Sequence, residues 1–182
     1  MTAKAAVRIR RAGLPEDEPG IAAIDTGFTT QSLFEIETRP RSIRLKKKRI
    51  PPRVKRFEIY DLGKDWREWD EAHVATEKDR IVGFVASSYQ FWNRRVVIWH
   101  LYVDPPHRRK GIGENLLAKV FERAERKKAL AVFLETSNLN VPGIAWYETR
   151  GFSLGGVDTT LYSGAKDAGE FGVFLVRRLS RA

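Results

Sequence analysis

The sequence contains no cysteine, which excludes a disulfide framework, a thiolate metal site and a cysteine nucleophile. Its three histidines, His73, His100 and His107, are too scattered along the chain to indicate a zinc site. No apolar run reaches the roughly 18 residues that a membrane span requires, and residues 1–6 lack the apolar stretch of a signal peptide. We therefore expect a cytoplasmic protein with no bound metal and no membrane partner.

The composition is that of a folded chain. Its 182 residues are 42% hydrophobic and include ten phenylalanines and five tryptophans, which is enough apolar material for one substantial core. No repeat or linker-like stretch divides the sequence. We predict a single domain over 1–182, with a core at 72–178 and an N-terminal strand, helix and basic hairpin at 1–56.

The net charge of +10 is concentrated in one segment. Ten basic residues fall between Arg39 and Arg56, a stretch without any acid, and the remaining 23 basic residues balance the 23 acidic ones. Such a segment is either a nucleic-acid-binding module or the solvated face of a hairpin. Because it holds no aromatic residue to stack on bases, we favour the solvated face and keep nucleic-acid binding as the alternative.

Apolar periodicity and turn residues predict a chain rich in strands, with a meander in its middle. Helices are expected after Pro15, at 113–128 and at 141–149. The segment 57–71 has no clear period and is left as a loop or short helix. A hairpin is expected with arms at 33–38 and 42–50, closed by Pro51 and Pro52, together with strands at 7–11, 73–77, 81–89, 96–103, 131–135, 156–162 and 171–177.

The segment from Asp104 to Gly113 joins the strand ending at Val103 to the helix that follows it. Its glycines let the main chain turn N–H groups toward an anion, and the start of the helix adds partial positive charge. Cationic side chains at 108–110 supply long-range attraction. The pattern predicts a phosphate-binding turn, and the alternative is a surface turn capped by glycines.

Two blocks resemble the GNAT superfamily of acetyltransferases. The first is Leu101-Tyr102-Val103-Asp104-Pro105 followed by Arg108-Arg109-Lys110-Gly111-Ile112-Gly113, which is similar to the loop that wraps the pyrophosphate of acetyl-CoA in that family. The second runs from Asn140 to Gly151-Phe152, with an asparagine seven residues before the helical Tyr147. The blocks occur in the family's order and separation, and the resemblance is firm over about 72–152.

The resemblance implies an α/β (α+β) protein with the GNAT fold, a central mixed, mostly antiparallel and splayed sheet of about seven strands flanked by helices. It implies an acetyl-CoA-dependent N-acetyltransferase in which the amine attacks the thioester directly. Acetyl-CoA would be bound by Leu101, Tyr102, Val103, Arg108, Arg109, Lys110, Gly111, Ile112, Gly113, Glu114, Asn140 and Tyr147. The splayed strand ending at Val103 would bond the pantetheine arm through its main chain.

Tyr147 would be the general acid, because a phenol with an unperturbed pKa near 10 is protonated at neutral pH and can protonate the departing thiolate. Two alternatives come from the residues themselves. Tyr147 is also a plausible core residue of an amphipathic helix. Asn140 is equally typical of a helix N-cap.

The source of the general base is open in the sequence. Many members of the family have Glu-Asp just before the apolar pair and valine of this strand, where this chain has Trp99-His100. Histidine side chains in general titrate close to neutral pH, and His100 is therefore a candidate base, directly or through water. It is equally a candidate for a packed strand residue. The missing acids also leave open a degenerate acetyl-CoA-binding protein without catalysis.

Further stretches at 91–95, 134–142 and 156–164, leading to Gly169-Glu170, resemble streptothricin acetyltransferases, which acetylate the β-lysine amine of a cationic antibiotic. A cationic acceptor needs carboxylates to bind it. The candidate acids are Asp25, Glu35, Glu37, Glu135, Asp158 and Glu170. The expected partners are therefore a small-molecule amine and, as an option, a second copy in a homodimer, with no specific nucleic acid.

Overall fold

The computed structural model describes residues 6–162 and 169–180, so that Ser163 and Gly164 of the last resemblance lie outside the described residues. The chain divides into two compact units. Unit 1 consists of Met1–Thr26, Arg56–Val132 and Leu179–Ala182, and unit 2 consists of Gly27–Lys55 and Phe133–Arg178. None of the helices in the described ranges is long and apolar enough to cross a membrane.

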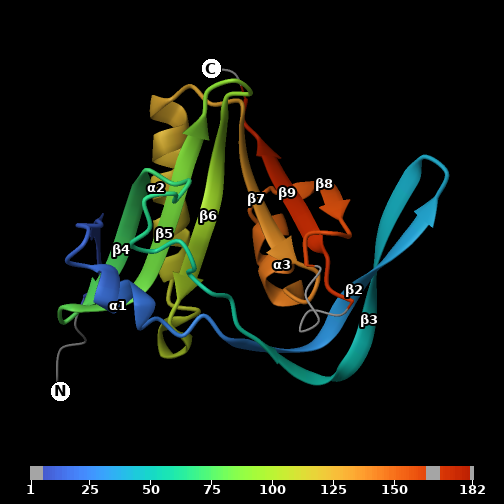
Figure 1. The fold of residues 1–182 in the computed structure, drawn as a ribbon, viewed down its shortest axis with the longest axis horizontal. Coiled ribbons are helices and arrows are strands. Elements are labelled where there is room, and N and C mark those ends of the chain that lie inside the picture. The colour runs from blue at the N-terminus through green and yellow to red at the C-terminus, as the bar shows by residue number, and fades with distance from the viewer. Residues whose placement is uncertain (1–5, 163–168, 181–182) are drawn as a thin grey trace. The chain divides into compact units, whose positions relative to one another are not determined.

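The strands of unit 1 are β1 (Arg8–Arg11), β4 (Glu71–Glu77), β5 (Arg80–Gln90) and β6 (Arg95–Val103), and they lie in the order β1-β4-β5-β6 (Figure 1). All three pairings are antiparallel. Between β4 and β5 the chain reverses at Lys78 and Asp79, which both have positive φ, as a tight two-residue hairpin turn requires. This confirms the antiparallel meander that the sequence predicts.

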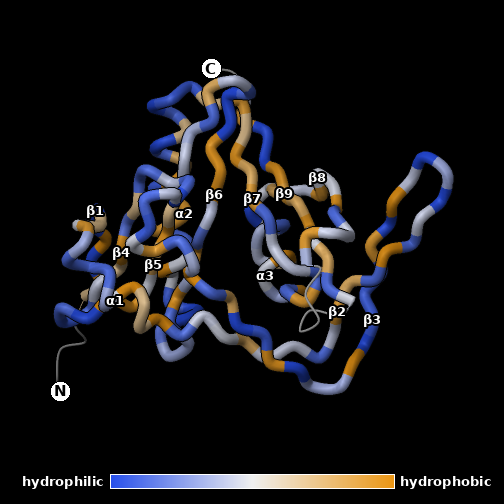
Figure 2. Tube along the Cα trace, viewed as in Figure 1, coloured by the Kyte–Doolittle hydropathy of each residue, from blue (hydrophilic) through white to orange (hydrophobic). Residues whose placement is uncertain are grey.

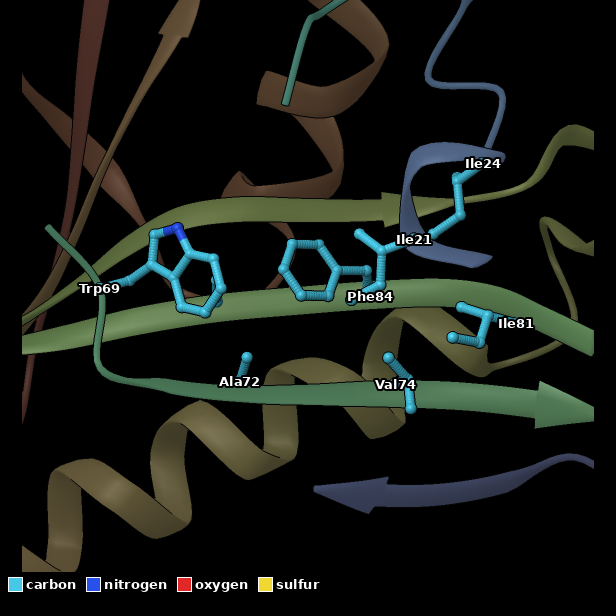
Figure 3. Close-up of a cluster of buried hydrophobic side chains, with 8 residues drawn as sticks. Ile21, Ile24, Trp69, Ala72, Val74, Ile81 and Phe84 are labelled. Carbon is cyan, nitrogen blue, oxygen red and sulfur yellow. The ribbon is translucent and has the colours of Figure 1, made fainter. Parts of the chain in front are cut away.

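Two helices cover opposite faces of this half of the sheet. Helix α2 (Ile112–Arg126) packs against the face of β5 that carries Gly83, because a Cβ at Gly83 would lie 3.0 Å from Leu116 and 3.2 Å from Ile112. Residues alternate across a strand, so Phe84 points to the other face. There it joins Trp69, Val74 and α1 (Glu18–Ala22), whose Ile21 is fully buried (Figure 3).

Unit 2 contains a long two-stranded hairpin, β2 (Phe28–Arg39) and β3 (Ser42–Lys55). Most of β3 is exposed, and the tip is hydrophilic (Figure 2). The sequence-based expectation that Pro51 and Pro52 end the second arm is wrong, because β3 continues through them. The register shifts there, with Thr30 opposite Arg53 and Ser32 opposite Arg49, and a bulge tolerates prolines because its residues need no ladder N–H.

The rest of unit 2 consists of β7 (Ala131–Ser137), whose first two residues belong to unit 1, α3 (Val141–Glu148), β8 (Ser153–Asp158) and β9 (Gly172–Arg178). These strands follow the order β7-β9-β8, and β8 pairs with β9 in antiparallel fashion. Strand β8 begins and ends earlier than the predicted 156–162. The seven sheet strands of the two units match the number expected, and the mixed, mostly antiparallel α/β class is confirmed.

Candidate functional site

The first half of the loop after β6 is fixed to unit 1 by side-chain hydrogen bonds. Asp104 is buried, and its carboxylate accepts bonds from the Asp25 N–H at 3.1 Å and from Arg80 at 2.8 Å. His107 lies 3.2 Å from Glu77. The Arg108 side chain turns back and donates from Nε to the Val103 carbonyl at 2.8 Å and from Nη2 to the Asp25 carbonyl at 3.2 Å. Arg108 therefore braces the loop, and its burial lowers its pKa.

The second half of the loop has the main-chain geometry of an anion cradle. Arg109 and Gly111 have positive φ, at 60° and 80°, and Gly111 is the N-cap of α2, with no side chain capping it. The first bond of the helix runs from the Asn115 N–H to the Gly111 carbonyl. By helix geometry the N–H groups just before it have no partner within the helix. Residues 109 and 110 are exposed cations, so the loop offers donors and positive charge to a phosphate.

His100 is buried on the same face of β6 as the core cluster of α1. Its ring contacts those of Phe84, Tyr102 and Tyr60. Nε2 lies 2.7 Å from Oδ1 of Asp61, and both side chains are 3% exposed. Nδ1 is buried and makes no hydrogen bond within the described residues. The orientation that the sequence leaves undecided is therefore inward, with one ring nitrogen paired and the other open.

Tyr147 is held by the way in which α3 ends. The Phe152 N–H donates to the Tyr147 carbonyl at 3.2 Å and the Gly151 N–H to the Glu148 carbonyl at 3.0 Å, which is the bond pattern of a Schellman motif. Gly151 has φ of 80°, which only glycine adopts readily. The Phe152 ring then packs on the Tyr147 ring, with centroids 5.2 Å apart. The Gly-Phe pair of the second sequence block thus fixes the ring of Tyr147.

Burial raises the pKa of Tyr147 above its usual value. The phenol is therefore protonated at any physiological pH, as a general acid must be before it acts. Tyr147 is thus a packed residue with an uncharged hydroxyl, and its role as general acid stays a prediction.

Asn140 caps α3. Its Oδ1 accepts from the Gly143 N–H at 3.1 Å and its Nδ2 donates to Oγ1 of Thr136 at 2.9 Å. A Cβ on Gly143 would lie 2.4 Å from the Asn140 side chain, so glycine at 143 is what lets the cap form. The side chain is engaged within unit 2, and its role toward acetyl-CoA stays a prediction.

The acids proposed for the acceptor have very different surroundings. Glu135 on β7 is largely buried and accepts a bond from the Tyr162 hydroxyl at 3.1 Å. Burial raises its pKa to about 7, against the lowering effects of the Tyr162 bond and the Lys55 charge. Glu170 is 1% exposed and paired with Lys55 at 2.7 Å and Arg53 at 3.2 Å. Of these two acids, Glu135 therefore has the weaker charge stabilisation from neighbouring cations, since Glu170 has two ion pairs.

The remaining acids are more exposed. Asp25 pairs with Arg56 at 3.2 Å, and Glu35 and Glu37 pair with Lys48 and Lys46 across the hairpin, at 2.6 and 3.4 Å. Asp158 accepts from the N–H and hydroxyl of Thr160, which lowers its pKa. These ion pairs engage Lys46, Lys48 and Arg56 of the basic segment, whose interpretation as a solvated face stays a prediction.

Sequence reasoning missed Asp61, Tyr162 and Lys55. Asp61 lies in the aperiodic segment 57–71, and no local pattern connects it to His100, which is 39 residues away. The sequence pattern does not distinguish Lys55 from the other nine cations of the basic segment. Only side-chain packing shows that it contacts the Tyr162 ring, 5.2 Å from the centroid, and pairs with Glu170.

Comparison with known proteins gives a consistent picture. The chain matches the Acetyltransferase (GNAT) family over residues 31–152. A streptothricin acetyltransferase of Streptomyces lavendulae is 34% identical over 173 residues, which are 91% of this chain and 92% of that protein. Streptothricin acetyltransferase A of Bacillus subtilis (strain 168) is 35% identical over 83 residues, 46% of this chain and 48% of that protein.

Solved structures agree with this. The crystal structure of nourseothricin acetyltransferase is similar with a TM-score of 0.85 and 33% identity, covering 96% of this chain and 99% of that one. A putative streptothricin acetyltransferase from Bacillus anthracis str. Ames, in complex with acetyl coenzyme A, is similar in fold, with a TM-score of 0.80 and 23% identity over 97% of this chain and 99% of that one.

Proposed function

The chain belongs to the acetyltransferase (GNAT) family and is an acetyl-CoA-dependent N-acetyltransferase, and we propose that its acceptor is the primary amine of a small cationic molecule of the streptothricin class. The observation that carries the acceptor class is the 34% identity to a streptothricin acetyltransferase over 91% of the chain. A match of that extent includes the segments outside the cofactor loop, where acceptor specificity is expected to reside.

We assign the cofactor's diphosphate to the loop 108–113. This assignment is supported by the positive φ of Arg109 and Gly111 and by the N-terminus of α2, which has no side-chain cap. The Arg108 side chain and the buried Ile112 hold the loop in place, so that exposed Arg109 and Lys110 supply the charge. A Cβ added at Gly111 would meet no atom within 4 Å, so its positive φ, rather than crowding, is the reason for glycine there.

The reaction needs a proton acceptor for the amine and a proton donor for the thiolate. Tyr147 is the proposed donor, since its phenol is uncharged and its ring is fixed. His100 is the proposed acceptor, and its unpaired Nδ1 supports that role. The acceptor amine, once deprotonated, attacks the thioester carbon directly. A cysteinyl acyl intermediate is excluded, because the chain has no cysteine.

Glu135 is the acid that we propose for binding a cationic group of the acceptor. A buried carboxyl whose pKa is about 7 gains more from an added ammonium than an exposed acid does, because the ammonium relieves the cost of burying its charge. Glu170 already has Lys55 and Arg53 as partners and is better suited to holding the end of β3.

The test is release of free CoA from acetyl-CoA with a panel of amines: streptothricin, free lysine, spermidine, an aminoglycoside and a simple primary amine that carries no further cationic group. We expect streptothricin to give the highest kcat/KM, by at least about 100-fold over the simple amine, equivalent to about 3 kcal/mol of discrimination. Preference for the simple amine refutes the acceptor class. Tight acetyl-CoA binding without transfer to any amine identifies a degenerate, non-catalytic protein instead.

A further inference from the structure

Asp61 and His100 form a buried pair within unit 1 whose geometry goes beyond packing. Two ring nitrogens lie within hydrogen-bond distance of Asp61: His100 Nε2 is 2.7 Å from Oδ1, and Trp69 Nε1 donates to Oδ2 at 2.8 Å. Trp69 lies in the core cluster beside Phe84 (Figure 3). Indole nitrogen can only donate a hydrogen bond, so Oδ2 of Asp61 must act as the acceptor from Trp69.

The charge of Asp61 decides which nitrogen of His100 carries the proton. Burial by itself would raise the pKa of Asp61, but the hydrogen bonds of His100 and Trp69 to its carboxylate, together with the charge of His100 whenever the imidazole is protonated, outweigh burial and hold that pKa below its usual value. An ionised carboxylate only accepts hydrogen bonds. Nε2 of His100 must therefore donate, and in the neutral imidazole the lone pair is then on Nδ1.

Nδ1 is the atom that lacks a partner. It is buried, and no described residue donates to it. A buried acceptor without a donor is unfavourable, so a partner from outside the protein is expected there. Of the three rings that contact His100, Phe84 is fully buried, whereas Tyr60 is 58% exposed and stacks on Trp66. Tyr60 is therefore the ring contact of His100 that is most exposed to solvent.

We propose that Asp61 is a positioning residue that holds His100 in the tautomer protonated at Nε2, so that Nδ1 accepts the proton of the acceptor amine. This rests on the proposed role of His100 as the base. The amine nitrogen forms a bond to the thioester carbon as the C–S bond breaks. The amine's proton passes to Nδ1, directly or through one water, and the Tyr147 hydroxyl protonates the sulfur. The imidazolium, stabilised by Asp61, then loses its proton to solvent, from which the phenolate regains one.

The tautomer is measured directly by 15N NMR of histidine-labelled protein at a pH where His100 is neutral, with the resonance assigned from His100→Gln. We expect Nε2 to be protonated and Nδ1 to be bare in the wild type. In Asp61→Asn the amide can donate as well as accept, so we expect the Nδ1-protonated tautomer to appear. Trp69→Phe removes the second bond to Asp61, together with part of the buried indole, and leaves the carboxylate in place; it is the control and is expected to keep the wild-type tautomer.

Kinetics give the second readout. Asp61→Asn should lower kcat by about 10-fold or more while the KM for acetyl-CoA stays within about twofold, because the cofactor loop is unchanged. Wild-type His100 protonated at Nδ1 overturns the proposal without any variant having to fold. An Asp61→Asn protein with unchanged tautomer and unchanged kcat overturns it too. Failure of the proposed function is separate, since it appears as absence of transfer by the wild type, whatever the tautomer.

Discussion

Replacing Glu135 with glutamine should stabilise the protein at alkaline pH and leave it little changed at acid pH. The pKa of Glu135 is raised from 4.5 to about 7, chiefly by burial. The unfolded chain releases this proton near pH 4.5, whereas the folded chain keeps it until about pH 7. The free energy of unfolding therefore falls as the pH rises between these values, and the loss is complete above about pH 7.

The size of the effect follows from the two pKa values. One pKa unit corresponds to about 1.4 kcal/mol, so the full loss is about 3 kcal/mol. Glutamine keeps an oxygen that can accept from the Tyr162 hydroxyl and has no proton to lose, so Glu135→Gln should escape the loss. For a chain of this size, about 3 kcal/mol is a difference of about 6–12 °C in Tm.

The assay is urea unfolding of wild type and Glu135→Gln at pH 5 and pH 8, followed by tryptophan fluorescence. Taking the difference between the two proteins at each pH cancels the titration of all other groups. Glu148→Gln, at an exposed acid of the same unit, is the control and should show no pH-dependent difference. If Glu135→Gln differs from wild type by the same amount at both pH values, burial does not raise this pKa and the reasoning is refuted.

Four further outcomes are expected. Tyr147→Phe keeps the ring packed against Phe152 and should lower kcat by about 100-fold or more with little change in the KM for acetyl-CoA, and unchanged turnover would remove Tyr147 from the acid role. Gly113→Glu should raise the stability of the free protein by about 0.5–1 kcal/mol, because glutamate is a better helix former than glycine and its charge is favourable at a helix N-terminus. The same negative charge should weaken acetyl-CoA binding far more than the uncharged Gly113→Gln does. Equal affinities of the two variants for acetyl-CoA, measured by calorimetry, would contradict the phosphate assignment. Gly151→Ala should cost about 1–2 kcal/mol in urea unfolding because of the positive φ, and a neutral effect would argue against the Schellman motif. Asn140→Ala should cost about 1 kcal/mol through loss of the cap, and an undiminished stability would show that the cap is dispensable.

Local structure was predictable from the sequence where a short pattern of residues determines the main chain. The strand-loop-helix unit around 104–113 follows from an apolar strand, a glycine-rich turn and a helical apolar stripe, all within about 25 residues. Tyr147, Gly151 and Phe152 likewise belong to one helix and its C-terminal turn, so their association needs no tertiary information. Pro51 and Pro52 wrongly predicted the end of a strand. Proline lacks the N–H that a regular ladder needs, but the register of β2 and β3 places a bulge at these residues, where that N–H is not required.

The sequence by itself determined the family, the glycine-containing turn at 108–113 and the helix of Tyr147, because these depend on short patterns of residues close together in the chain. Only the tertiary structure decided what His100 and the acids contact. Asp61 is 39 residues from His100, and Arg53 is 117 residues from Glu170. No periodicity encodes such pairs. They arise when segments distant in sequence are buried against one another. That burial also decides that Glu170 is paired with cations, that Asp61 lies between two ring nitrogens and that Glu135 has a pKa of about 7.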